Sequence, residues 1–118
     1  MTAGGCFCGK VRIQLNGQPL KAGLCHCLDC RKLTGSIYSF GFVIKTADLE
    51  VLGSTPLFGQ GMKADGTPEE TTVLRAGILE DSQVLTEWKP QAELYTDRRL
   101  EWVPPIEGAA QCSAMIPL

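Results

Sequence analysis

Six cysteines are the residues of this chain best suited to chemistry, and five of them fall in two short motifs. The longer motif, Cys25-His-Cys-Leu-Asp-Cys30, places three thiols within six residues. A tight turn lets such a run converge on one ion, and zinc held by three protein ligands keeps a fourth position open for catalysis. The spacing therefore predicts a catalytic zinc site formed by Cys25, Cys27 and Cys30.

The same motif also allows a closed structural site, whose fourth ligand would be His26 or the distant Cys112. His26 lies between two of the thiols, so we expect its side chain to point away from the ion. Asp29 is typical of a solvated loop residue and receives no role. Arg31 and Lys32 follow the motif directly. They are expected either to offset the negative charge of three thiolates around a divalent cation or to bind the carboxylates of an anionic substrate.

The shorter motif, Cys6-Phe-Cys8, is flanked by glycines and supplies only two ligands. A closed structural zinc site needs four, and the chain contains no Cys-x-x-Cys pair outside the longer motif. Cys112 is the one remaining cysteine and stands alone in the tail. The motif predicts an incomplete structural zinc site, or else two buried free thiols that pack as small hydrophobic residues.

Length and charge restrict the class of protein. A chain of 118 residues fits one domain over residues 1–118. The net charge of −2 argues against a nucleic-acid partner, because phosphate binding calls for a basic surface. No apolar run approaches the roughly 18–20 residues of a membrane span, and the first residues lack the pattern of a secretory signal. We therefore expect a cytoplasmic protein with reduced thiols, no membrane association and no nucleic-acid binding.

Hydrophobic alternation predicts a mainly β fold without internal repeats. Strands are expected over residues 11–15, 37–44, 48–52 and 71–79, the last with a bulge or close contact at Gly77. A single helical turn is expected around residues 28–33. The glycine-rich stretch 53–70 is predicted to be a loop, and the chain from Pro90 onward to be irregular.

Four segments of the sequence resemble one family, the glutathione-dependent formaldehyde-activating enzymes, also called the centromere protein V-like family. They are Gly4–Arg12, Cys25–Ser36, Ala76–Asp81 and Arg99–Trp102. The resemblance implies a small zinc-binding β-tent domain of several short, coiled antiparallel sheets. It also implies a carbon–sulfur lyase of the S-(hydroxymethyl)glutathione synthase type, whose substrates are glutathione and formaldehyde or a related small carbonyl compound.

The resemblance assigns roles to residues of both motifs. Cys25, Cys27 and Cys30 match the catalytic zinc ligands, and Cys6 with Cys8 matches half of the structural site. A further group, next to the longer motif, is expected to bind substrate: Arg31, Lys32, Thr34 and Ser36. For the hydroxyls of the last two, capping of a turn is an equally weighted alternative.

The sequence departs from the family at one place. Members carry a Phe-Cys-x-x-Cys-Gly-Ser motif after the central strands, and here Leu52 runs directly into Gly53. This predicts an internal deletion at about residues 52/53 and one zinc ion, with the second site incomplete. The alternatives to an enzyme are therefore a non-catalytic zinc-binding domain or a truncated, inactive paralogue.

Overall fold

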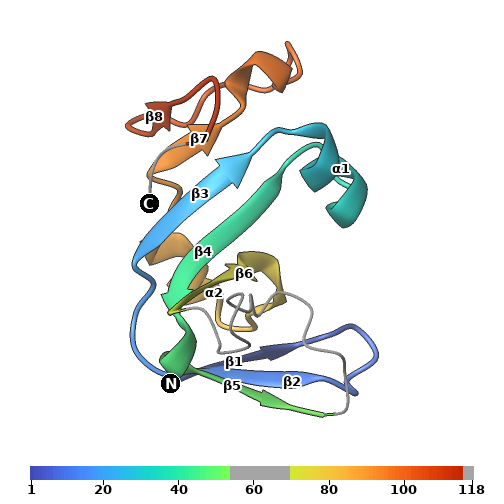
Figure 1. Cartoon of the computed structure of the whole chain (residues 1–118), viewed down its shortest axis with the longest axis vertical. Helices are drawn as coiled ribbons and strands as arrows, with labels where there is room; N and C mark the ends of the chain where they lie inside the picture. The colour runs from blue at the N-terminus through green and yellow to red at the C-terminus, as the bar shows by residue number, and fades with distance from the viewer. Residues whose placement is uncertain (54–69, 116–118) are drawn as a thin grey trace.

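Two β-sheets packed on a common core form the structure, a computed structural model that describes residues 1–53 and 70–115 (Figure 1). The strands are β1 Thr2–Gly5, β2 Arg12–Leu15, β3 Lys21–Cys25, β4 Ser39–Lys45, β5 Leu49–Leu52, β6 Thr71–Arg75, β7 Ala92–Leu94 and β8 Ala110–Gln111. The helices are α1 Leu28–Thr34 and α2 Ser82–Glu87, with short 3-10 helices at Thr46–Asp48, Ala76–Ile78 and Thr96–Arg98.

The strand order is β1-β2-β5 in the smaller sheet and β6-β4-β3-β7-β8 in the larger one. The prediction of a mainly β fold with several short sheets is confirmed. The expectation of purely antiparallel pairing is wrong for two pairs, because β7 runs parallel to β3 and β8 runs parallel to β7. A parallel neighbour needs a long crossover connection, and here the chain passes through β4, β5, β6 and α2 before it returns beside β3.

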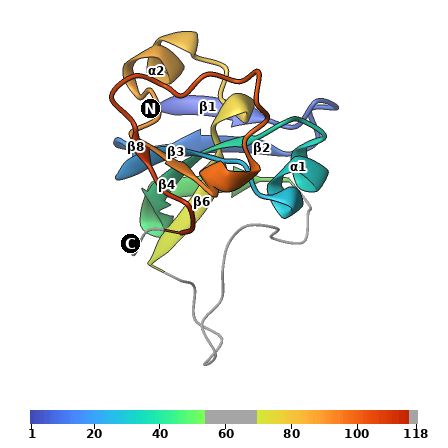
Figure 2. The same ribbon diagram turned by 90° about the horizontal axis from the view of Figure 1, so that it is seen from above.

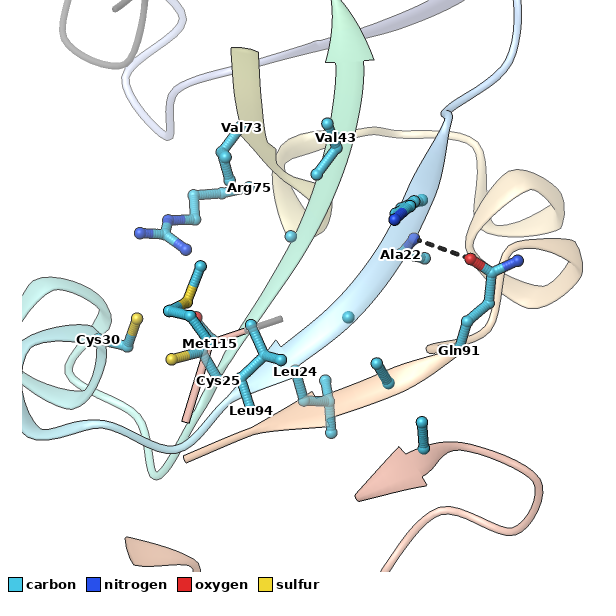
Figure 3. Close-up of a pocket in the computed structure, with 16 residues that line it drawn as sticks. Ala22, Leu24, Cys25, Cys30, Val43, Val73, Arg75, Gln91, Leu94 and Met115 are labelled. Atoms are coloured by element: carbon cyan, nitrogen blue, oxygen red, sulfur yellow. Dashed lines mark hydrogen bonds between the residues drawn. The ribbon is translucent and has the colours of Figure 1, made fainter. Parts of the chain in front are cut away.

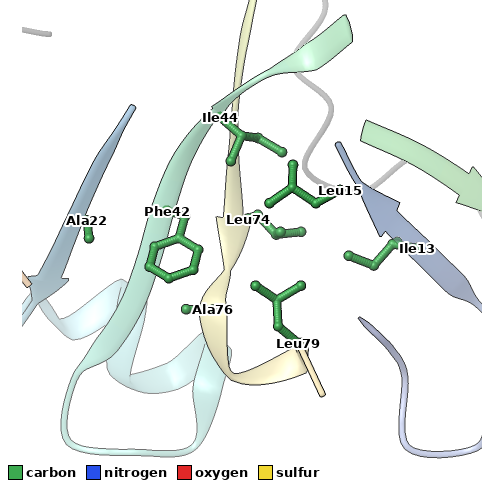
Figure 4. Close-up of a cluster of buried hydrophobic side chains, with 8 residues drawn as sticks. All are labelled: Ile13, Leu15, Ala22, Phe42, Ile44, Leu74, Ala76 and Leu79. Atoms are coloured by element: carbon green, nitrogen blue, oxygen red, sulfur yellow. The ribbon is translucent and has the colours of Figure 1, made fainter. Parts of the chain in front are cut away.

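The hydrophobic core lies between the two sheets (Figure 4). Alternate residues of β2, β4 and β5 face it, as the pleat of a strand requires. Its fully buried members include Leu15 from β2 and Phe42 with Ile44 from β4, and α2 adds the partly buried Val84 and Leu85. Core side chains therefore cover the inner face of the larger sheet, and the opposite face lies outside the core.

Three predicted strands and the predicted helical turn correspond closely to β2, β4, β5 and α1. The fourth strand ends at Arg75 instead of continuing to Leu79, and Gly77 lies in a 3-10 helix rather than a bulge. The tail from Pro90 onward is not irregular throughout, since it contains β7 and β8. Most of the predicted loop 53–70 lies outside the described residues.

The two α-helices lie on opposite sides of the molecule (Figure 2). α2 contacts the core, whereas α1 follows the end of β3 and has no fully buried residue. None of the helices in the described part of the chain is long and apolar enough to cross a membrane.

Candidate active site

The turn from β3 into α1 brings three thiols together. Cys25 ends β3, Cys27 is the residue that caps the N-terminus of α1, and Cys30 lies in the first turn of that helix. Cys27 has extended backbone angles, φ −65° and ψ 158°, and its Sγ accepts a hydrogen bond of 3.3 Å from the backbone N–H of Cys30. The three sulfur atoms lie within 4.8 Å of one another. The predicted convergence of the motif is thus present.

The helix that carries this cluster ends as sharply as it begins. Gly35 adopts the left-handed conformation, with φ 67°, and its N–H donates to the carbonyl of Arg31 over 2.8 Å. A glycine favours this ending because a side chain would be strained at that φ. α1 is therefore a two-turn element whose function in the fold is to hold Cys27 and Cys30 opposite Cys25.

His26 points away from the thiols, as the sequence predicts. Its ring is fully buried, its Nε2 lies 2.8 Å from Glu93 Oε1, and Tyr38 packs edge-on against it with ring centroids 5.6 Å apart. The His26 ring is therefore not one of the grouped ligands. Cys112, the other candidate for a fourth ligand, also lies outside the cluster.

Glu93 contacts the motif on the side that faces away from the thiols, through His26. Its carboxylate accepts hydrogen bonds from the N–H of Ile106 at 2.8 Å and from Gln111 Nε2 at 2.7 Å, and Arg99 lies 3.4 Å away. Burial alone would raise the pKa of this carboxyl. The hydrogen bonds from Gln111, Ile106 and His26, with the nearby guanidinium, outweigh burial and hold its pKa at about 2. Glu93 is an ionised, fully buried group that fixes the position of His26.

The pKa values and the spacing of the three thiols favour the binding of a cation. Burial raises the pKa of Cys25 to about 12, with further increases from Cys27 and Cys30, so a nearby positive charge would favour ionisation of this thiol at neutral pH. Burial opposes ionisation at Cys27 too, but its bonds from Cys30 and Cys25 outweigh that effect and lower its pKa. Sulfur atoms around tetrahedral zinc lie about 3.8 Å apart, given Zn–S bonds of about 2.3 Å. Three half-buried thiols within 4.8 Å therefore fit a zinc ion after a small contraction.

A cavity of about 470 Å³ opens beside the cluster on the outer face of the larger sheet (Figure 3). Cys25 and Cys30 form part of its wall. Its other lining residues include alternate positions of neighbouring strands, because strand pairing places Gly23 opposite Gly41 and Gly41 opposite Arg75. The cavity therefore extends from two of the three thiols over the outer face of the larger sheet.

Arg75 is the cationic side chain whose guanidinium lies nearest the thiol end of the cavity (Figure 3). In the described residues it forms no ion pair. The sequence analysis missed it, although the predicted strand over 71–79 already places it on the same face as Val73. What the sequence lacked was the register that sets β6 against β4 and so directs this face toward Cys25.

The four residues predicted to bind substrate lie on α1 and in the turn that follows it. Arg31 is half-buried, and Lys32, Thr34 and Ser36 are exposed. The Thr34 hydroxyl donates to the Cys30 carbonyl over 2.8 Å and accepts the N–H of Ser36 at 3.2 Å. The Thr34 hydroxyl therefore caps the turn, which is the alternative to substrate binding considered for it in the sequence. None of the four lies in the cavity wall, and their contact with substrate stays a prediction.

Cys6 and Cys8 lie in the exposed turn between β1 and β2. Their sulfur atoms are 3.4 Å apart, and the N–H of Val11 donates to Cys6 Sγ over 3.2 Å. That bond, followed by the one with Cys8, lowers the pKa of Cys6 to about 7. No third cysteine, histidine or carboxylate within the described ranges joins them. The pair is not buried as the alternative interpretation would require, and it has the form of half a metal site.

The end of β5 lies directly beside this turn. Leu52 pairs with Arg12, and a side chain at Gly53 would collide with the backbone of Lys10 and Val11. A segment inserted between Leu52 and Gly53 would therefore start next to Cys6 and Cys8. The internal deletion at about residues 52/53 stays a prediction.

Comparison with known proteins identifies the family. A model of the glutathione-dependent formaldehyde-activating enzyme family matches residues 1–68, which is more than half of the chain. The chain belongs to this family, as the resemblance predicted. The matched residues contain both cysteine motifs. No curated protein matches the chain significantly.

Proposed function

We propose that this chain is a zinc-dependent carbon–sulfur lyase of the S-(hydroxymethyl)glutathione synthase type. It would join glutathione to formaldehyde or to a related small carbonyl compound. The observation that carries the proposal is the position of Cys25 and Cys30 in the wall of a cavity large enough for a substrate. Family membership supports the same chemistry.

The proposed reaction is an addition without oxidation or reduction. The glutathione sulfur forms a bond with the carbonyl carbon, the carbon–oxygen double bond becomes a single bond, and the thiol proton is transferred to the oxygen. A zinc ion bound by Cys25, Cys27 and Cys30 would favour the thiolate form of glutathione and act as a Lewis acid. Three thiolate ligands donate strongly, so we expect activation of the thiol to matter more than polarisation of the carbonyl.

The residues of the chain would orient the substrates. Glutathione carries two carboxylates, and the guanidinium of Arg75 is placed to bind one of them beside the thiols. Arg31 and Lys32 would attract the same anion from the α1 side. The cysteines must stay reduced to act as ligands, which supports a cytoplasmic location.

The experiment is to follow the formation of S-(hydroxymethyl)glutathione from labelled formaldehyde by NMR exchange spectroscopy, with zinc-loaded protein. The Cys112→Ser variant controls for the loss of a thiol in general, because Cys112 lies outside the cluster. Acceleration over the spontaneous reaction by both proteins supports the proposal.

The incomplete pair Cys6 and Cys8 favours a second candidate, a zinc-binding domain without turnover. In that case the protein would hold zinc at the longer motif and leave the rate of adduct formation at its spontaneous value. The same NMR measurement separates the two functions.

A further inference from the structure

The cavity beside the thiols is much larger than formaldehyde requires. A single water molecule occupies about 30 Å³ of liquid, and formaldehyde has only one more heavy atom. The cavity measures about 470 Å³, within the range of sites that hold whole small-molecule ligands. Its size therefore indicates that it holds more than formaldehyde, and the chemistry of its walls decides which substrate group fills the remaining space.

Two glycines make the hollow. Gly23 of β3 and Gly41 of β4 are direct partners across the sheet, so the middle of this face carries no side chains. A Cβ on Gly41 would lie 3.2 Å from Val73 Cγ1 and 3.9 Å from Arg75 Nη1. The space over these glycines is therefore bounded on the β6 side by an apolar side chain and a cation.

The lining of the cavity is mainly apolar, although Lys21 and Gln91 also belong to it. Val43 and Val73 line one side (Figure 3). Ala92 and Leu94, the strand partners of Gly23 and Cys25, line the other. Val73 is 50% exposed, so part of this apolar surface is in contact with water when the cavity is empty of ligand. Covering such surface is favourable for an apolar group. Contact with this apolar surface is unfavourable for the carboxylates, amides and ammonium group of glutathione, which would lose hydrogen bonds to water.

We propose that the carbonyl substrate is an aldehyde with an apolar substituent of several carbons, which lies over Gly23 and Gly41 in this cavity. The inference rests on the proposed function and narrows its substrate class. The reaction is the same addition: a sulfur–carbon bond forms at the aldehyde carbon, and the thiol proton moves to the oxygen. Glutathione lies at the end near Cys25 and Arg75, and the substituent of the aldehyde extends along the apolar walls.

Binding of stable thioethers tests the inference without turnover. S-methylglutathione and S-hexylglutathione differ by five methylene groups and resemble the sulfur–carbon bond of the adduct. Full burial of each methylene contributes about 0.8 kcal/mol, close to a fourfold change in affinity. Because the cavity is open to solvent on one side, we expect the hexyl compound to bind at least tenfold more tightly by calorimetry. Equal Kd values overturn the inference.

A variant that fills the hollow locates the binding. Gly41→Val puts a side chain between Val73 and Arg75, and it should remove the advantage of the hexyl compound while S-methylglutathione still binds. Gly77→Val is the matched control, because Gly77 is exposed and a side chain there meets nothing within 4 Å. An unchanged hexyl advantage in folded Gly41→Val overturns the placement. If that variant does not fold, Gly41→Ala and the wild-type series still decide the question.

Failure of this inference and failure of the proposed function give different results. Adduct formation with formaldehyde, combined with equal binding of the two thioethers, rejects the apolar substituent and keeps the lyase. Tighter binding of the hexyl compound, with no acceleration for formaldehyde or hexanal, rejects the lyase and keeps an apolar ligand site. With both in place, kcat/KM for hexanal should exceed that for formaldehyde after correction for the spontaneous reaction.

Discussion

His26 Nε2 lies 2.8 Å from Glu93 Oε1, and both side chains are completely buried behind the turn that carries the three thiols. The backbone N–H of His26 also donates to the carbonyl of Leu94 over 3.1 Å. The residue between Cys25 and Cys27 is thus fixed to β7 through its side chain and its backbone. This contact joins the turn that carries the three thiols to the C-terminal part of the chain.

Glu93→Gln should destabilise the protein. The amide cannot accept the charge-assisted bonds that the carboxylate receives from Gln111, Ile106 and His26. Losing bonds to a buried charged group costs about 2–3 kcal/mol of unfolding free energy at pH 7. Chemical denaturation of the reduced protein measures this difference. The exposed-site variant Glu107→Gln should stay within about 0.5 kcal/mol of wild type, and an equally small effect at Glu93 would contradict the assigned role.

The same carboxylate predicts a pH dependence. Its pKa is about 2 in the folded protein and near its usual 4.5 in the unfolded chain. The stability that it contributes is therefore complete above about pH 4.5 and is lost as the pH falls toward 2. The stability difference between wild type and Glu93→Gln should shrink across this range. A difference that stays constant from pH 7 to pH 2 would show that the carboxyl is not held ionised.

The sequence predicts the thiol cluster better than its surroundings, for a physical reason. Cys25, Cys27 and Cys30 are close in sequence, so a local turn is enough to bring them together. The contact between His26 and Glu93 joins residues 67 positions apart through a parallel strand pair. That pairing depends on packing that no short sequence pattern records, and the sequence alone therefore predicts an irregular tail.

Strand patterns show the same limit. β2 and β4 alternate apolar and polar or aromatic residues and were predicted. β1 has the sequence Thr-Ala-Gly-Gly and shows no such pattern. It forms a strand because it pairs with β2 along its length and with Leu79 at Gly4. Arg75 was predicted to lie in a strand, but its place beside the cavity follows from the register with Gly41.

We expect Arg75 to make the main contact with the negative charge of glutathione. Arg75→Met removes one of the two cationic residues that line the cavity, the one beside the thiols, and leaves Lys21. We expect KM for glutathione to rise about tenfold with kcat little changed, because a carboxylate contact is made equally before and during the reaction. Arg31→Met combined with Lys32→Met should raise KM by a smaller factor, since both residues lie outside the cavity wall. Arg98→Met, on an exposed 3-10 helix, is the control. A fall in kcat with unchanged KM would instead place Arg75 in the chemical step.

Zinc stoichiometry tests the incomplete second site. We expect no more than one tightly bound zinc ion per chain, held by the longer motif, because Cys6 and Cys8 supply two of the four ligands that a closed site needs. The double variant Cys6→Ser, Cys8→Ser should keep that ion. Elemental analysis of purified protein that shows two ions per chain would contradict this account.

Insertion of a family-type segment should add a second zinc ion. A family-type segment with Phe-Cys-x-x-Cys, inserted before Gly53, would begin beside Cys6 and Cys8. Because metal binding contributes folding free energy in small domains, the melting temperature should rise together with the zinc content. The same insertion with serines in place of its cysteines is the control, and an equal rise in melting temperature for both would assign the gain to the added strands alone.

The most direct test of the proposed catalytic site is the rate of S-(hydroxymethyl)glutathione formation by the Cys27→Ser variant. A serine hydroxyl is a far poorer ligand for zinc than a thiolate, and Cys27 is both a member of the cluster and the N-terminal cap of α1. A serine oxygen can still cap the helix, so the fold should persist. The account predicts a rate equal to that of the spontaneous reaction. A folded Cys27→Ser protein that forms the adduct as fast as wild type would contradict it.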